Sequence, residues 1–257
     1  MVSRDSNGVC EGSARRMTFP LPGALMSTKC INAFSSTKTF LQQNFMTAKR
    51  IPSGIVAGLN VFDVNDHKAG GYRLATLDKP GEHGKVERPL MGHWVPQGGF
   101  CDIPANPGAT GYVFTPDFSG CSILIDHIDD TTYRVFHVQG GSDYLNKEYL
   151  SRFDGHGLGF ATAMTFDDYG EDAYPRGFAF MKFEEGRWWI YFQCQNGVGL
   201  NFAYGKFQMN GAQTVRGGGR IPVPNLKRES PRHGVVHSGK ALAMPASQRP
   251  ALKVEVW

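Results

Sequence analysis

The sequence predicts an α+β fold whose core is a β-sandwich of mixed sheets, flanked by a few helices and long loops. The 257 residues include 32 glycines and 15 prolines, which favour many short strands joined by turns. Aromatic residues make up 12% of the chain, and several recur at the two-residue spacing of strands. Apolar residues make up 41%, enough for a sizeable core.

Composition divides the chain into three segments. Residues 1–28 are polar and aperiodic, so we expect a flexible arm there. Residues 29–216 carry the periodic apolar pattern and are predicted to form a single β-rich domain. From residue 217 to 257, proline, glycine, serine and basic residues replace that pattern, which predicts a flexible or peripherally packed tail.

Charge and cysteine usage exclude several classes of protein. The net charge of +4 is scattered along the chain without a basic stripe, so we expect no nucleic-acid partner. No run of 18 apolar residues predicts a membrane span, and no secretory core precedes the domain, so export would use a route without a cleaved signal peptide. The five cysteines are irregularly spaced, which argues against a disulfide framework or zinc site. We expect a monomer without a metal or other cofactor.

The first half of the domain is predicted to contain one helix and a strand pair. Apolar spacing favours an amphipathic helix over 31–48, with Ser35 and Ser36 as possible caps. Residues 54–64 and 72–76 are expected to form one or two strands and their return strand. The proline- and glycine-rich stretch 88–110 is predicted to be an ordered loop.

The second half is predicted to consist mainly of hairpins. The expected elements are a hairpin over 114–138, a helix over 142–153 capped by Ser142, a strand over 159–166, an acidic turn over 167–172, a hairpin over 177–195 and a strand over 200–209. Trp188, Ile190, Phe192 and Cys194 share one strand face, so Cys194 is expected to be a buried core thiol.

Cys121 and His137 are the candidate nucleophile and base. They lie sixteen residues apart on the two strands of the hairpin over 114–138. A loop of three or five residues, such as Asp129 to Thr131, would place both side chains on one face, whereas a two-residue loop would place them on opposite faces. Asp-Asp is a poor two-residue turn, which favours the odd length. His127 has the same strand parity as Cys121 and competes as its partner.

The residues before the cysteine suggest how it could react. Gly120 permits a sharp turn that exposes the amides of Ser119 and Gly120 beside the sulfur, where they would serve as oxyanion donors. A histidine in reach would hold the thiol as a thiolate. Such a pair could attack a carboxamide, expel ammonia and hydrolyse the resulting thioester. The alternative is that one cysteine and one histidine lie in neighbouring strands by chance.

At these residues the chain resembles the glutamine-deamidating bacterial toxins of the cytotoxic necrotizing factor and Burkholderia lethal factor type. The matching segment runs from Phe118-Ser119-Gly120-Cys121 to Tyr133-Arg134-Val135-Phe136-His137. Through the resemblance, Thr115 becomes a third candidate site residue.

The resemblance implies a secreted toxin or virulence effector with a cofactor-free Cys-His dyad on a β-sandwich. Its activity would be that of a hydrolase, a protein-glutamine deamidase. The substrate would be a protein of a host or rival cell, either a Rho-type GTPase or a translation-initiation helicase, and the bacterial protein would act in the target-cell cytoplasm. Deamidation and transglutamination stay open.

Two other interpretations remain. A non-catalytic β-sandwich could bind carbohydrate or protein through a groove lined by Trp94, Trp188, Trp189 and Tyr191. A papain-like peptidase has the same order of cysteine and histidine, but the interval between them is too short for that fold.

Overall fold

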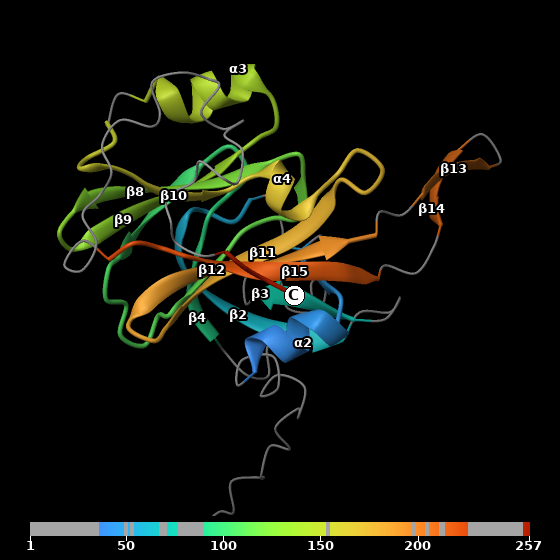
Figure 1. The fold of residues 1–257 in the computed structure, drawn as a ribbon, viewed down its shortest axis with the longest axis horizontal. Coiled ribbons are helices and arrows are strands. Elements are labelled where there is room, and N and C mark those ends of the chain that lie inside the picture. The colour runs from blue at the N-terminus through green and yellow to red at the C-terminus, as the bar shows by residue number, and fades with distance from the viewer. Residues whose placement is uncertain are drawn as a thin grey trace, which may run out of the picture.

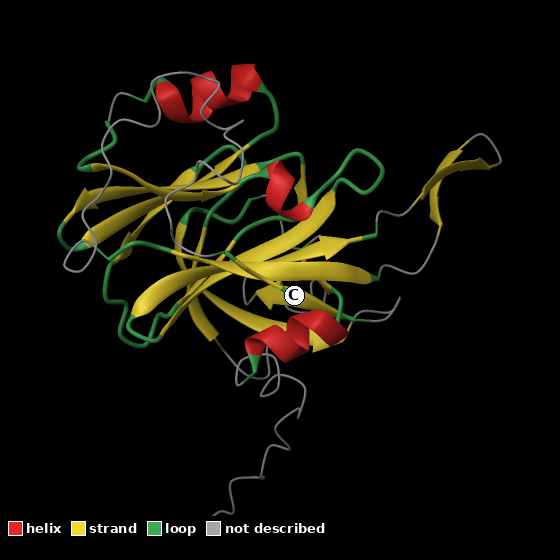
Figure 2. Cartoon of the chain, in the orientation of Figure 1, coloured by secondary structure: helices red, strands yellow, loops and turns green. Residues whose placement is uncertain are grey.

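Two facing β-sheets form the body of the molecule in the computed structural model (Figures 1 and 2). The predicted arm over 1–28 and most of the predicted tail lie outside the residues that the structure describes. The structure describes residues 36–48, 51, 54–66, 71–76, 90–152, 155–196, 199–203, 206–210, 214–225 and 254–257.

The larger sheet is mixed, because two of its strand pairs, β1 with β3 and β4 with β6, are parallel while the others are antiparallel. Its strands, in spatial order, are β1 (Met46–Thr47), β3 (Tyr72–Thr76), β2 (Gly58–Asp66), β4 (Leu90–Trp94), β6 (Tyr112–Phe114), β11 (Arg176–Glu184), β12 (Arg187–Gln195), β15 (Val215–Pro222) and β16 (Glu255–Val256). The short strand β7 (Phe118–Ser119) also pairs with β11.

The smaller sheet is antiparallel and carries the hairpin that was predicted over 114–138. Its order is β10 (Gly159–Met164), β8 (Ser122–Asp129), β9 (Thr132–Val138) and β5 (Phe100–Pro104). A separate strand pair consists of β13 (Gly199–Ala203) and β14 (Lys206–Asn210), where a single strand was predicted.

The main apolar core lies between the two sheets. Side chains of Ile123, Ile125 and Val135 from the smaller sheet join Trp188 and Ile190 from the larger one. This is the two-residue alternation of strands buried on a common face. The fold-class prediction of an α+β sandwich is therefore confirmed.

Short helices pack on the outer faces of the sheets and against the core between them (Figure 1). Helix α2 (Thr37–Gln43) packs Phe40 and Leu41 against the larger sheet, and it is shorter than predicted because Asn44 is already extended. Helix α3 (Ser142–Leu145) continues as the π-helix η1 (Asn146–Leu150), and α4 is Phe166–Tyr169. Within the described part of the chain, no helix is long and apolar enough to cross a membrane.

Helix caps differ from the prediction at two places. The N-cap of α3 is Gly141 rather than Ser142. The stretch predicted to be an acidic turn instead begins with α4, whose capping box joins Thr165 and Asp168.

Part of the stretch 88–110 forms strands, which corrects the prediction of a loop. It contains β4 and β5, which pair with β2 and β9 respectively. Two of its prolines lie where they leave these ladders intact: Pro96 lies between the two strands, and Pro104 is the last residue of β5.

The predicted tail boundary at residue 217 is also wrong. Strand β15 runs beyond it to Pro222 and pairs along β12, with Ile221 buried. Glycine allows this close approach, since a Cβ at Gly218 would lie 2.3 Å from the backbone oxygen of Phe192. Propensity rules do not predict this strand, because they disfavour glycine in strands.

Candidate functional site

A β-bulge places Cys121 and His137 on the same face of the smaller sheet. The hairpin closes on the pair Asp129–Thr132, so its turn has two residues rather than the predicted three or five. The register shifts by one residue at Ile128. Beyond this bulge, the two strands pair as they would with an odd-length loop, so Cys121 and His137 share a face. His137 pairs with Ile123, two residues from Cys121, and such diagonal neighbours have Cα atoms about 7–8 Å apart.

His127, the competing partner, lies at the other end of the strand. It is six residues from Cys121, a separation of about 20 Å along an extended chain. Its Nε2 hydrogen-bonds the carbonyl oxygen of Pro224 at 2.9 Å. The structure therefore brings His137, and not His127, next to the cysteine.

Thr115 follows β6 and reaches the imidazole of His137. Its Oγ1 lies 2.6 Å from His137 Nδ1 and 2.7 Å from the carbonyl oxygen of Val95. A carbonyl only accepts, so the single hydroxyl proton points to Val95, and Oγ1 can then only accept the proton on Nδ1. This fixes the neutral tautomer with the proton on Nδ1, which leaves the lone pair of Nε2 free to act as a base.

Burial keeps His137 uncharged. The side chain is fully buried, and the ring of Phe118 stacks on it with centroids 4.5 Å apart. Within the described residues, its Nε2 has no hydrogen-bond partner. Desolvation lowers the pKa of His137 from its ordinary value of 6.5 to about 3. The imidazole is therefore neutral at pH 7.

Cys121 is also buried, and this overturns the prediction of a resting thiolate. Desolvation raises the pKa of Cys121 above its ordinary 9.0; backbone hydrogen bonds from Ser119 and Gly140 lower it less, and the charge of Glu148 raises it further. Moving the proton from Cys121 to His137 is therefore unfavourable at both ends, because burial disfavours the thiolate and the imidazolium alike. In this closed state the pair is a neutral thiol and a neutral imidazole.

The turn before Cys121 has the predicted shape but not the predicted free donor. Gly120 adopts φ +101°, a conformation that favours glycine, and begins the sharp turn into β8. Its amide, however, donates to the Tyr169 hydroxyl at 2.8 Å, and the same hydroxyl donates to the Cys121 carbonyl at 2.9 Å. The prediction that Gly120 offers a free oxyanion donor is therefore wrong, whereas the backbone of Ser119 does hydrogen-bond the sulfur.

Gln97 is a site residue that the sequence reasoning missed. It lies between β4 and β5, is exposed, and places its Nε2 3.9 Å from the buried sulfur of Cys121. The same segment holds His137 in place, because the Gly98 amide donates to the His137 carbonyl and the His137 amide donates to Gly99. No local sequence motif predicts this contact, because Gln97 and Cys121 are 24 residues apart in the sequence.

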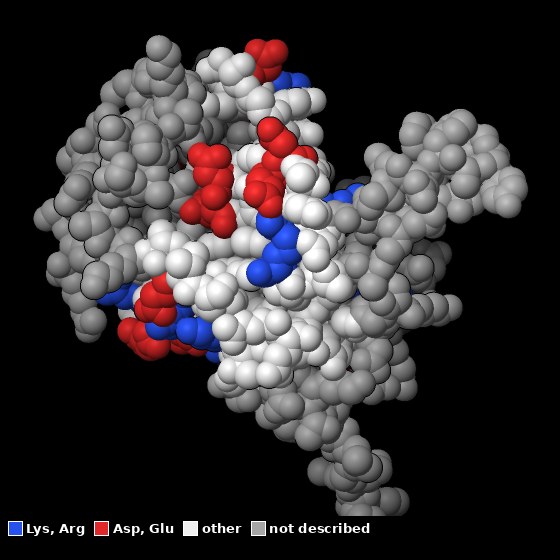
Figure 3. Space-filling model, turned by 45° about the vertical axis from the view of Figure 1, so that its right-hand side comes forward, with Lys and Arg blue, Asp and Glu red and all other residues white. Residues whose placement is uncertain are grey.

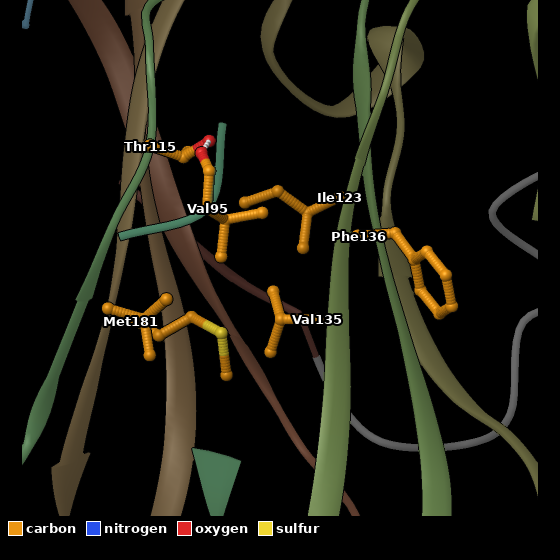
Figure 4. A pocket seen from close by; sticks show the side chains of 7 residues that line it. Val95, Thr115, Ile123, Val135, Phe136 and Met181 are labelled. Atoms are coloured by element: carbon orange, nitrogen blue, oxygen red, sulfur yellow. Dashed lines mark hydrogen bonds between the residues drawn. The ribbon is translucent and has the colours of Figure 1, made fainter. Parts of the chain in front are cut away.

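A narrow gap between the sheets ends at this site. It is lined by Val95, Val113, Thr115, Ile123, Val135, Phe136 and Met181, and it has no room for a water molecule. Figure 4 shows Thr115 beside Val95, with Ile123, Val135 and Met181 around the gap. The gap is apolar, and of the three candidate site residues only Thr115 lines it.

The predicted aromatic groove is absent from the described structure. Trp94, Trp188, Trp189 and Tyr191 are all buried, and Trp188 packs in a different core from Trp189 and Tyr191. Figure 3 shows small groups of acidic and basic side chains interspersed on the face drawn there. These aromatic residues stabilise the two cores and do not line a binding surface.

The fold and site define a β-sandwich domain with a buried cysteine, a neutral histidine and a threonine that orients it. A family model, the Mcf1 activator-binding domain, matches residues 31–216, and the chain belongs to this family. The matched range is close to the domain predicted over 29–216, although β15 continues beyond its end. A search of curated proteins found no match.

Proposed function

We propose that this domain is a cysteine-dependent glutamine deamidase in which Cys121 is the nucleophile, His137 the general base and acid, and Thr115 the residue that orients the imidazole. The observation that carries the proposal is the fixed tautomer of His137. Thr115 holds the proton on Nδ1, and the unpartnered Nε2 belongs to the side chain that shares a sheet face with Cys121. The resemblance to deamidating toxins supports the same three residues.

The reaction follows from these positions. The sulfur of Cys121 forms a bond to the carboxamide carbon of a substrate glutamine while the thiol proton moves to His137 Nε2. The C–N bond then breaks, and ammonia leaves with that proton. Water, deprotonated by Nε2, attacks the thioester and releases a glutamate side chain and the free thiol. The net change is hydrolysis of one amide bond.

The closed state must open for this chemistry to run. Burial disfavours both the thiolate and the imidazolium, so the closed state contains little of the reactive ion pair. Admitting substrate or water beside Gln97 would reduce the desolvation of both groups and bring their pKa values together. We infer that the described conformation is the resting state of the site.

The test is mass spectrometry of candidate target proteins after incubation with the full chain. A deamidated glutamine gains about 1 Da, since –NH₂ is replaced by –OH, and ammonia is released in equal amount. The gain should vanish in Cys121→Ser and His137→Ala and persist in His127→Ala. A mass gain that persists in Cys121→Ser would contradict the proposal.

Binding of an activator protein is the second candidate function. Family membership favours it, because the family is described as the activator-binding domain of Mcf1. A binding function needs no reactive thiol and is compatible with a closed site.

The two functions separate in the Cys121→Ala variant. A binding domain should capture its partner protein from target-cell extract equally well with and without the sulfur, while a deamidase loses ammonia release. Absence of a captured protein with both wild type and variant would count against the binding function.

A further inference from the structure

A chain of three hydrogen-bonded side chains runs from the π-helix to the sulfur of Cys121. Glu148, on η1, is buried and accepts two bonds from Gln139, one from its backbone amide at 2.8 Å and one from Nε2 at 2.6 Å. The Oε1 of Gln139 in turn accepts from Gln97 Nε2 at 3.3 Å. Gln97 Nε2 also faces Cys121 Sγ at 3.9 Å.

The carboxylate at the start of this chain sets the direction of every bond in it. An ionised carboxylate only accepts, so Gln139 must present its NH₂ group to Glu148 and its carbonyl oxygen to Gln97. Gln97 must then present its own NH₂ group to Gln139, which leaves the second N–H pointing to the sulfur. The orientation of Gln97 therefore follows from the network and not from an arbitrary choice of amide rotamer.

The backbone keeps this chain close to the site. Gly98 adopts φ +73°, which favours glycine, and its backbone packs so close to the carboxylate that a Cβ there would lie 2.9 Å from Glu148 Oε1. The neighbouring amide of Gly98 holds the backbone of His137. The donor and the base are thus carried by one short segment between β4 and β5.

We propose that Gln97 is a catalytic residue whose side-chain N–H binds the oxyanion that forms when Cys121 attacks a carboxamide, and that Gln139 and Glu148 position it. The proposal rests on the deamidase function above and supplies the donor that Gly120 cannot provide, because the Gly120 amide is occupied by Tyr169. A fixed donor beside the sulfur needs little reorganisation when the carbonyl oxygen becomes negative.

The test compares two reactions at Cys121 in the full chain. Acylation by p-nitrophenyl acetate passes through an oxyanion, with p-nitrophenolate as the leaving group, whereas alkylation by iodoacetamide displaces iodide without one. Both rates are read on the Cys121 peptide by mass spectrometry, and their ratio cancels differences in access to the buried sulfur. Circular dichroism checks that each variant is folded.

Gln97→Ala should lower the ratio of acylation to alkylation by about 100-fold, the loss seen when one oxyanion donor is removed. Gln43→Ala, the same change at an exposed glutamine at the end of α2, should leave the ratio unchanged. Glu148→Gln should also lower the ratio, because a glutamine can donate and so releases the fixed orientation of Gln139 and Gln97. Removing the negative charge near the thiol favours the thiolate in both reactions and cancels in the ratio. A purely structural role would change both rates by the same factor and leave the ratio unchanged.

The outcomes separate this inference from the function it rests on. If wild-type Cys121 is acylated and Gln97→Ala keeps the ratio within threefold, the oxyanion role is overturned and the deamidase function stands. If the mass gain of a target glutamine persists in Cys121→Ser, the deamidase function itself fails, and the role of Gln97 fails with it.

Discussion

Replacing Thr115 by valine should destabilise the fold far more than its small change in shape suggests. The variant leaves two buried groups without a partner, the carbonyl of Val95 and the Nδ1–H of His137. An unsatisfied buried polar group costs about 1–3 kcal/mol, so the free energy of unfolding should fall by about 2–6 kcal/mol. Thr115→Ser keeps the hydroxyl and loses one methyl group, for about 1 kcal/mol.

The assay is urea unfolding of both variants and the wild type at pH 7, combined with ¹⁵N NMR of the imidazole nitrogens. In the wild type, the His137 proton should reside on Nδ1. Thr115→Val should lose that preference, and Thr115→Ser should retain it. If valine costs no more than serine, or if the wild-type proton resides on Nε2, the assignment of Nε2 as the base is refuted.

Two further predictions concern His137 and the edge of the predicted tail. Because burial lowers the pKa of His137 to about 3, the unfolded chain binds a proton below pH 6.5 that the folded chain does not, and stability should fall by up to about 5 kcal/mol between pH 6.5 and 3. Urea unfolding across this range should show that the free energy of unfolding falls less steeply with decreasing pH in His137→Gln than in the wild type. An equal dependence on pH in both proteins would refute the lowered pKa of His137. Gly218→Ala should lower the free energy of unfolding by about 1–3 kcal/mol, because the new Cβ meets the backbone of Phe192. Gly54→Ala, at a position with open space around it, should leave the free energy of unfolding nearly unchanged. Equal urea midpoints for the two variants would show that β15 is peripheral.

The fold could be predicted where the pattern is local. The hairpins of the smaller sheet and of β11 and β12 follow from two-residue alternation and turn residues, and the latter pair closes on Glu185 and Gly186, both at positive φ. β4, β5 and β15 were missed because proline and glycine mask strands whose stability comes from pairing with distant partners. Strand propensity depends on the type of each residue, whereas these strands are stabilised by pairing and packing within the sheet.

The proximity of Cys121 and His137 could be predicted only conditionally, and their protonation state could not be predicted. The sequence placed both on one face if the turn had an odd length, but the turn has two residues, and the structure reaches the same parity through a bulge at Ile128 that no turn rule shows. The pKa values depend on how deeply both side chains lie in the core, which spacing does not reveal. The position of Gln97 beside Cys121 could not be predicted, because its partners Cys121 and Gln139 come from separate segments of the chain.

Opening of the closed site and binding of a partner protein would be coupled by thermodynamic linkage if the partner prefers one state of the site. If a bound protein favours the state in which Cys121 is open, then a reversible ligand that binds only the open state must strengthen that binding by the same factor. The segment holding Gln97 is suited to such coupling, because its backbone bonds His137 and its side chain covers the sulfur at the surface. A partner contacting this exposed side chain would act on Cys121, His137 and Gln97 together, which are the proposed nucleophile, base and oxyanion donor.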